Sequence, residues 1–163
     1  MENKGKINRA SENGIHSKNN GWAAEHYAAI VNGFRRDGRP GKTDLFKDGR
    51  RIEVKFFTVK PATAKKNAEY NSAHGFKANK SEPLLDQLAR YCRKFDALLV
   101  GVGENPQTAE YQLFTRKEAF EFLSKRFSYK NGSDEIRFCW GGKSLESRLE
   151  GRLNTLRKHG YII

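Results

Sequence analysis

The sequence of 163 residues contains only two cysteines and no long apolar segment. Cys92 and Cys139 are too few for a disulfide framework or a cysteine-based zinc site, so we expect two reduced thiols in a cytoplasmic protein. No hydrophobic run approaches the roughly 18 residues of a membrane-spanning helix, and the first residues lack the apolar stretch of a secretory signal. These absences favour a single domain with no membrane partner.

Acidic residues are also scarce relative to basic ones. The chain has 31 lysines and arginines against 19 aspartates and glutamates, which gives a formal net charge of +12. This excess is spread along the chain rather than gathered in one amphipathic helix, which favours a nucleic-acid groove over an anionic membrane surface. A generally solvated basic surface would carry the same charge, so the charge alone does not decide the partner.

Hydrophobic periodicity predicts an α/β fold with a mixed central sheet flanked by helices. In the first half we expect a helix over 20–32, strands over 43–47 and 50–57, and a long polar loop over 58–80. A helix capped by Ser81 and strands over 97–102 and 109–114 should follow. Thr115 and Glu118 should open the next helix, in which Phe127 still faces the core, before a strand over 136–140 and a last helix with a leucine face. Residues 1–19 are predicted to be a basic flexible arm and 20–127 the core. Residues 128–163 form a C-terminal strand and helix, in the same domain or as a dimerisation appendage.

Asp48 and Gly49 give the strongest local signal, because Asp-Gly between two alternating segments is typical of a two-residue β-hairpin. In that register Lys47 pairs with Arg50 and position 45 faces position 52. One face of the hairpin then carries apolar side chains that must be buried, namely Leu45, Ile52, Val54 and Phe56.

The other face of this hairpin brings together charged groups. Asp44 would lie opposite Glu53, and Lys55 projects from the same face because it follows two residues later. Two carboxylates directly opposite each other repel, so their pairing makes sense if a divalent cation lies between them. An all-oxygen site suits Mg²⁺, with Mn²⁺ as a substitute, and the carbonyl of Val54 can contribute a further ligand. Lys55 would then stabilise developing charge or orient a water beside a phosphate.

The segment from Asp44 to Glu53-Val54-Lys55 resembles the active-site motif of the PD-(D/E)XK nuclease superfamily, which has the restriction-endonuclease-like fold. The resemblance covers roughly residues 20–115 and implies that Asp44, Glu53 and Lys55 form a metal-dependent active site, with Glu25 on the preceding helix as a further acid. Thr43 stands where the motif has proline. The resemblance implies a Mg²⁺-dependent endonuclease that hydrolyses duplex DNA, like a small type II restriction enzyme.

Other interpretations remain open at this point. Phage-type nucleases and Holliday junction resolvases share the pattern, so a structure-specific nuclease is an alternative. A non-catalytic nucleic-acid-binding module would explain the charge but not the facing carboxylates. Glu-x-Lys on a strand is usually only a solvated face, and Glu25 is equally compatible with a solvent-facing acid on an alanine-rich helix.

Basic and amide side chains on both sides of the hairpin are candidates for DNA binding. They are Arg35, Arg36, Arg39, Lys42, Lys60, Lys65, Lys66, Asn67, Asn71 and Lys77. Cutting both strands of a symmetric site would favour a homodimer, and the last helix or the Trp140 strand can supply its interface. Gln87 is expected to be a surface amide, and Arg152 to lie outside the leucine face of the last helix.

Overall fold

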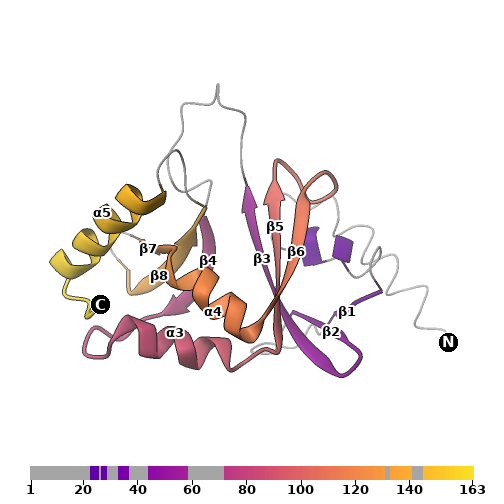
Figure 1. The fold of residues 1–163 in the computed structure, drawn as a ribbon, viewed down its shortest axis with the longest axis horizontal. Helices are drawn as coiled ribbons and strands as arrows, with labels where there is room; N and C mark the ends of the chain where they lie inside the picture. The colour runs from indigo at the N-terminus through magenta and orange to yellow at the C-terminus, as the bar shows by residue number, and fades with distance from the viewer. Residues whose placement is uncertain are drawn as a thin grey trace.

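The computed structural model describes residues 23–25, 27–28, 33–36, 44–58, 72–130, 133–140 and 145–163. In this part of the chain the protein has mixed α/β structure, with two sheets and three helices that have defined bounds (Figure 1). Residues 23–25 and 27–28 are helical, as predicted. The arm predicted over residues 1–19 lies outside the described residues. Among the described helices, none has both the length and the apolar character that a membrane crossing needs.

The larger sheet is mixed and has the strand order β1-β2-β3-β5-β6. Its strands are β1 (Arg35–Arg36), β2 (Leu45–Lys47), β3 (Arg50–Thr58), β5 (Ala97–Gly103) and β6 (Glu110–Thr115). β3 is parallel to β5 and antiparallel to β2. The predicted hairpin register is confirmed, since Leu45 pairs with Ile52 and Lys47 with Arg50. Asp48 and Gly49 have φ angles of 52° and 75°, which is the backbone that a tight primed turn requires.

A second, antiparallel sheet with the order β4-β8-β7 was not predicted. It contains β4 (Ser72–Lys77), β8 (Glu135–Cys139) and β7 (Phe127–Tyr129). The predicted loop over 58–80 is therefore wrong over 72–77, and Phe127 begins a strand instead of closing a helix. The partner of β4 is distant in sequence, because Ser72 pairs with Cys139, so no local pattern predicts it. Gly75 lies at a bulge where a Cβ atom would be 2.4 Å from the Ile136 carbonyl oxygen.

The helices α3 (Leu84–Cys92), α4 (Arg116–Ser124) and α5 (Leu145–Lys158) follow the predicted order. The capping of α4 is confirmed, because Thr115 Oγ1 accepts a hydrogen bond from the Glu118 N–H at 3.2 Å. The prediction that Ser81 caps α3 is wrong. Pro83 holds the N-cap position, and Ser81 donates from its N–H and its hydroxyl to Asn79 Oδ1.

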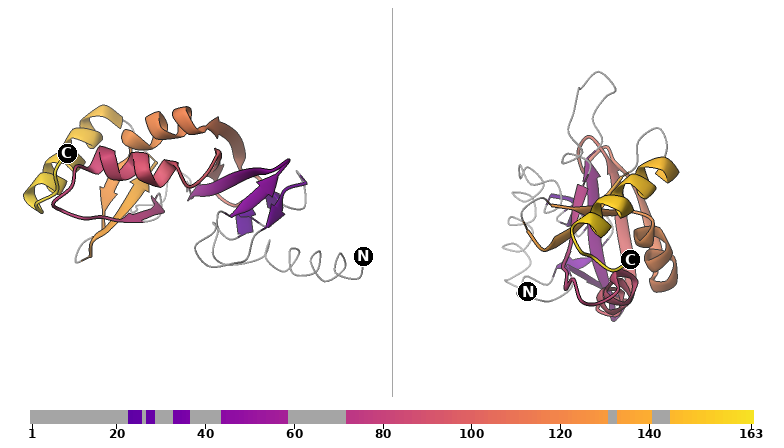
Figure 2. Two further views of the ribbon diagram at one scale, coloured as in Figure 1. Left: turned by 90° about the horizontal axis from the view of Figure 1, so that it is seen from below. Right: turned by 90° about the vertical axis from the view of Figure 1, so that its left-hand side faces the viewer.

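Two apolar cores lie on opposite faces of the larger sheet. The hairpin-side core contains the predicted apolar face of the hairpin and residues of the N-terminal helical segment, among them Leu45, Ile52, Val54, Phe56 and Ala24. The helix-side core joins the larger sheet to the smaller sheet and to all three helices, through Phe57, Leu88, Leu98, Leu123, Phe138 and Leu156. Figure 2 shows α3 and α4 running alongside the smaller sheet toward the larger one. β3 is therefore covered on both faces, except where Glu53 and Lys55 interrupt the apolar series.

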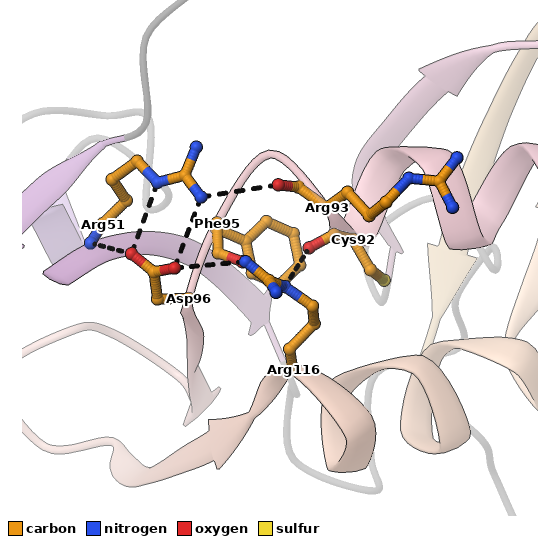
Figure 3. Close-up of polar contacts among 6 residues, drawn as sticks. All are labelled: Arg51, Cys92, Arg93, Phe95, Asp96 and Arg116. Carbon is orange, nitrogen blue, oxygen red and sulfur yellow. Dashed lines mark hydrogen bonds and ion pairs between the residues drawn. The ribbon is translucent and has the colours of Figure 1, made fainter.

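An ion-pair network fixes the start of β3 to the turn between α3 and β5 (Figure 3). Asp96 accepts hydrogen bonds from the Arg51 backbone N–H at 2.8 Å and from both guanidinium groups of Arg51 and Arg116. Arg116 also donates to the carbonyl oxygens of Cys92, the last residue of α3, and of Phe95, three residues later. This network sets the position of β3 relative to α3, and thereby of the charged groups described next.

Candidate active site

Asp44 lies one residue before β2 and turns its carboxylate toward β3. Its Oδ2 accepts a hydrogen bond of 2.8 Å from the backbone N–H of Val54. Because the N–H and C=O of one strand residue point to the same side, the Val54 carbonyl oxygen also points to the side on which Asp44 lies. The formal ladder ends with the pair Leu45–Ile52, so Asp44 stands just beyond it and still lies within electrostatic reach of Glu53.

Glu53 is held by two donors from different elements. Its Oε1 accepts from the Lys55 ammonium at 3.1 Å and from the Tyr91 hydroxyl at 3.3 Å. Lys55 is only 8% exposed, and its Nζ lies 5.5 Å from the centre of the Tyr91 ring. Tyr91 comes from α3, so the helix fixes one oxygen of the Glu53 carboxylate. Oε2 has no such donor among the described residues.

The carboxyl group of Asp44 is in an unfavourable environment for a negative charge. Burial, followed by the neighbouring carboxylates of Glu53 and Glu25, raises the pKa of Asp44 from 3.8 to about 8. The hydrogen bond from Val54 and the charge of Lys55 lower that pKa but do not compensate for the rise. Asp44 therefore lies within electrostatic reach of two further acidic side chains, and among the described residues Lys55 supplies the ammonium group that acts on it.

Lys55 is the cation of this group. Burial lowers the pKa of its ammonium, but the acidic groups of Tyr91, Glu53 and Asp44 raise the pKa further than burial lowers it. The net direction is upward, which favours the charged form of Lys55. A charged ammonium can stabilise a negative charge on a phosphate or orient a water molecule.

The donors at this place fit a hard cation. Asp44, Glu53 and the Val54 carbonyl supply oxygen atoms only, as Mg²⁺ and Mn²⁺ prefer. Within the described ranges, no three acidic, histidine or cysteine side chains gather closely enough to hold a metal by themselves. An ion here would therefore depend on two carboxylates, the backbone and further oxygens from water or substrate, which is the usual arrangement for Mg²⁺.

The structure brings together part of the predicted set of residues. Asp44, Glu53, Lys55 and Glu25 interact electrostatically, and Val54 lies with them. The predicted DNA-binding residues are placed in three ways. Arg35 and Arg36 form β1 beside β2, and Lys77 is exposed on β4 of the smaller sheet. The others lie outside the described residues, namely Arg39, Lys42, Lys60, Lys65, Lys66, Asn67 and Asn71.

Sequence reasoning missed one residue of the site and misplaced another polar one. Tyr91 was not among the predicted site residues, and its hydroxyl reaches Glu53. Gln87 is wrong as a surface amide, because it is 3% exposed and bonds the backbone of Asn79 in both directions and the Glu82 carbonyl. Gln87 thus anchors the segment before α3 and does not face the site. An aromatic or amide residue on an amphipathic helix carries no signal that distinguishes these roles.

No protein-family model and no curated protein matches this sequence. What the site can do therefore follows from its chemistry. The neighbouring carboxyl groups of Asp44 and Glu53, of which Asp44 has a raised pKa, form an environment in which an added positive charge is favourable. A buried lysine beside them adds a positive charge to the same place.

Proposed function

We propose that this protein is a Mg²⁺-dependent endonuclease that hydrolyses phosphodiester bonds in duplex DNA, with a restriction-endonuclease-like core. One observation carries the proposal: the half-buried Asp44, just before the hairpin, lies within electrostatic reach of Glu53 and Glu25, and Lys55 bonds Glu53 on β3. Repulsion between neighbouring carboxylates lowers the stability of the fold. Because the chain has 31 basic residues that can pair with acids, an arrangement that keeps this repulsion indicates a functional role.

The chain's own residues take separate roles in this proposal. Asp44 and Glu53 would hold a Mg²⁺ ion together with the Val54 carbonyl, and the ion, when bound, supplies positive charge to a phosphate oxygen and lowers the pKa of water. Lys55 keeps its proton and offsets negative charge on the scissile phosphate. Tyr91 orients Glu53 through Oε1, and Oε2 would be the oxygen that helps to hold the ion. Glu25 adds negative charge near Asp44 and so favours cation binding.

Incubation of supercoiled plasmid with the protein tests this proposal. We expect nicked and linear DNA in Mg²⁺ or Mn²⁺, none in EDTA, and at least about 100-fold slower cleavage by Lys55→Ala. Lys94→Ala is the matched control, because Lys94 is an exposed lysine in the turn after α3 and outside the site. Cleavage by Lys55→Ala at the rate of the control would refute the role of the site, provided that both variants unfold at the wild-type temperature.

A non-catalytic nucleic-acid-binding module is the second candidate, because the described residues contain no set of three metal-binding side chains. Such a module would shift the plasmid in a salt-sensitive way without metal-dependent nicks. A structure-specific nuclease is separated from a restriction-like enzyme by comparing a four-way junction with a linear duplex of the same sequence. Preference for the junction would assign branched DNA as the substrate.

A further inference from the structure

Three arginines near the smaller sheet each have a side-chain nitrogen that is fully buried and lacks a hydrogen-bond acceptor. The atoms are Arg126 Nε, Arg137 Nε and Arg152 Nη1. None of the three side chains has a carboxylate partner among the described residues. A buried donor without an acceptor destabilises the fold, and the loss is larger for a charged group. Other arginines are fully engaged, as Arg51, Arg90 and Arg116 are by aspartate or glutamate.

The register of the smaller sheet places two of these arginines on one face. The Cys139 N–H donates to the Arg126 carbonyl, one position beyond the pair Phe127–Phe138. Arg137 pairs with Ser128, two residues after Arg126, so positions 126 and 137 are diagonal neighbours on the same face. The opposite face carries Phe127 and Phe138, which belong to the helix-side core.

Arg152 approaches this group from α5, which packs against β7. It precedes the fully buried Leu156 by one helical turn, so it lies on the packed side of the helix and the expected outward position is wrong. Burial lowers the pKa of Arg126, and the positive charge of Arg152 lowers that pKa further. The two like charges therefore act on each other near the contact between α5 and β7.

The acids nearest in register do not neutralise this group. Glu135 stands two residues before Arg137 on β8, but it already pairs with His74 and Lys130. His74 lies directly opposite Arg137 on β4. The face of the smaller sheet around Arg137 is therefore basic on balance.

Arg126 is held in a fixed orientation by two aromatic rings. Its guanidinium carbon lies 4.0 Å from the centre of the Phe122 ring and 4.6 Å from that of Trp140. Stacking of this kind leaves the edge of the guanidinium plane available for hydrogen bonds, which suits bidentate binding of phosphate. Both rings also pack on Phe57, two residues after Lys55 on the same face of β3. The arginines and the candidate active site are thus connected through one side of the strand.

We propose that Arg126, Arg137 and Arg152 form a phosphate-binding cluster for the backbone of a nucleic acid. The three side chains are only half-buried, and phosphodiester oxygens would accept from the guanidinium N–H groups that remain exposed and would offset the repelling positive charges. The inference rests on the proposed function only in taking DNA as the ligand, since the cluster is separate from Asp44, Glu53 and Lys55. No base sequence is read by these contacts.

Binding of a short duplex DNA in EDTA tests the cluster without cleavage. Fluorescence anisotropy over a range of salt concentrations gives Kd and its salt dependence. We expect Arg137→Gln and Arg152→Gln each to raise Kd about fivefold and to reduce the slope of log Kd against log salt by about 0.9. Arg157→Gln is the matched control, because Arg157 is exposed on the same helix and bonds only Asn154 among the described residues. Equal effects of the cluster variants and the control would overturn the proposal.

Thermal unfolding with inorganic phosphate separates two sources of the anion. If phosphate stabilises the wild type but not the Arg137→Gln, Arg152→Gln double variant, and DNA affinity falls in that variant, the cluster binds phosphodiesters as proposed. If phosphate stabilises the wild type and DNA affinity is unchanged in the variant, the cluster takes a small anion and the nucleic-acid assignment is wrong. Loss of DNA binding by the variants together with absence of plasmid cleavage would refute the nuclease and leave the cluster supported.

Discussion

Two carboxylates near β3 illustrate opposite uses of charge. Asp96 accepts hydrogen bonds from Arg51 and Arg116, and these contacts lower its pKa. The largest contribution comes from the Arg51 side chain and the next from the Arg51 backbone N–H. Asp44 is buried beside Glu53 and Glu25, and its pKa rises to about 8. Ionisation of Asp96 therefore stabilises the folded protein, whereas ionisation of Asp44 destabilises it.

This difference separates a structural ion pair from a binding site. A chain with a net charge of +12 has ample base to neutralise every acid, and it does so at Asp96. At Asp44, among the described residues, burial and the carboxylates of Glu53 and Glu25 outweigh the charge of Lys55, which is the basis of the proposed cation site. The residues of a ligand site often lower the stability of the unliganded protein, because their charges are neutralised only when the ligand binds.

The largest expected effect comes from removing the charge of Asp44. Asp44→Asn keeps an oxygen that can accept from the Val54 N–H but removes a carboxylate from the proposed metal site. We expect metal-dependent plasmid cleavage to fall by at least about 100-fold. Asp134→Asn, in the exposed turn before β8, is the control. Undiminished cleavage by Asp44→Asn would exclude this carboxylate from the metal site.

Removal of the Asp96 carboxylate should have the converse effect. Asp96→Ala leaves Arg51 and Arg116 without their carboxylate acceptor, and we expect the free energy of unfolding to fall by about 2 kcal/mol. Chemical denaturation measures this loss, with Glu121→Ala on the exposed side of α4 as control. Cleavage per folded molecule should stay near the wild-type value. A large loss of activity at unchanged stability would contradict the structural role of Asp96.

Much of the fold around the site could be predicted, because its signals are local. Asp48-Gly49 fixed the register by its turn chemistry, and the alternation of Ile52, Val54 and Phe56 identified the buried face. With the register known, the meeting of Asp44 and Glu53 follows from geometry.

The parts that failed depend on contacts between distant segments. β4 pairs only with β8, and neither the bulge at Gly75 nor three-residue β7 has a periodic pattern long enough to detect. The role of Tyr91 depends on how α3 packs over β3, and the burial of Arg152 depends on where α5 meets β7. Such packing relations are not encoded in the spacing of residues along one segment.

The pH dependence of stability sharpens the contrast between the two carboxylates. For Asp44 the pKa in the folded protein lies above its ordinary 3.8, so the folded state binds more protons than the unfolded state between about pH 4 and 8. The stability of the metal-free protein therefore falls as pH rises through this range. Asp44→Asn avoids that loss, so we expect its stability relative to the wild type to rise as pH increases from about 4 to about 8, with the two proteins equally stable near pH 4.

For Asp96 the sign is reversed. Its pKa in the folded protein lies below the ordinary 3.8, so its stabilisation is complete above that pH and disappears as pH falls below it. The difference in melting temperature between wild type and Asp96→Ala should thus narrow in acid, while that for Asp44→Asn widens in base. Parallel pH profiles for the two variants would show that the carboxylates have the same kind of environment, contrary to the comparison.

The smallest expected effect belongs to Tyr91, which touches Glu53 without being a metal ligand. Tyr91→Phe keeps the ring packed on Phe76 and Phe95 but removes the donor to Glu53 Oε1. Lys55 still holds that oxygen, so the carboxylate gains freedom but stays in place. We expect a threefold to tenfold rise, on the order of 1 kcal/mol, in the Mg²⁺ concentration needed for half-maximal cleavage, at nearly unchanged maximal rate. Tyr111→Phe, whose hydroxyl bonds the Pro106 carbonyl, should leave the metal requirement unchanged. If both variants shift the metal requirement equally, the hydroxyl of Tyr91 does not orient Glu53, and Lys55 alone positions the carboxylate.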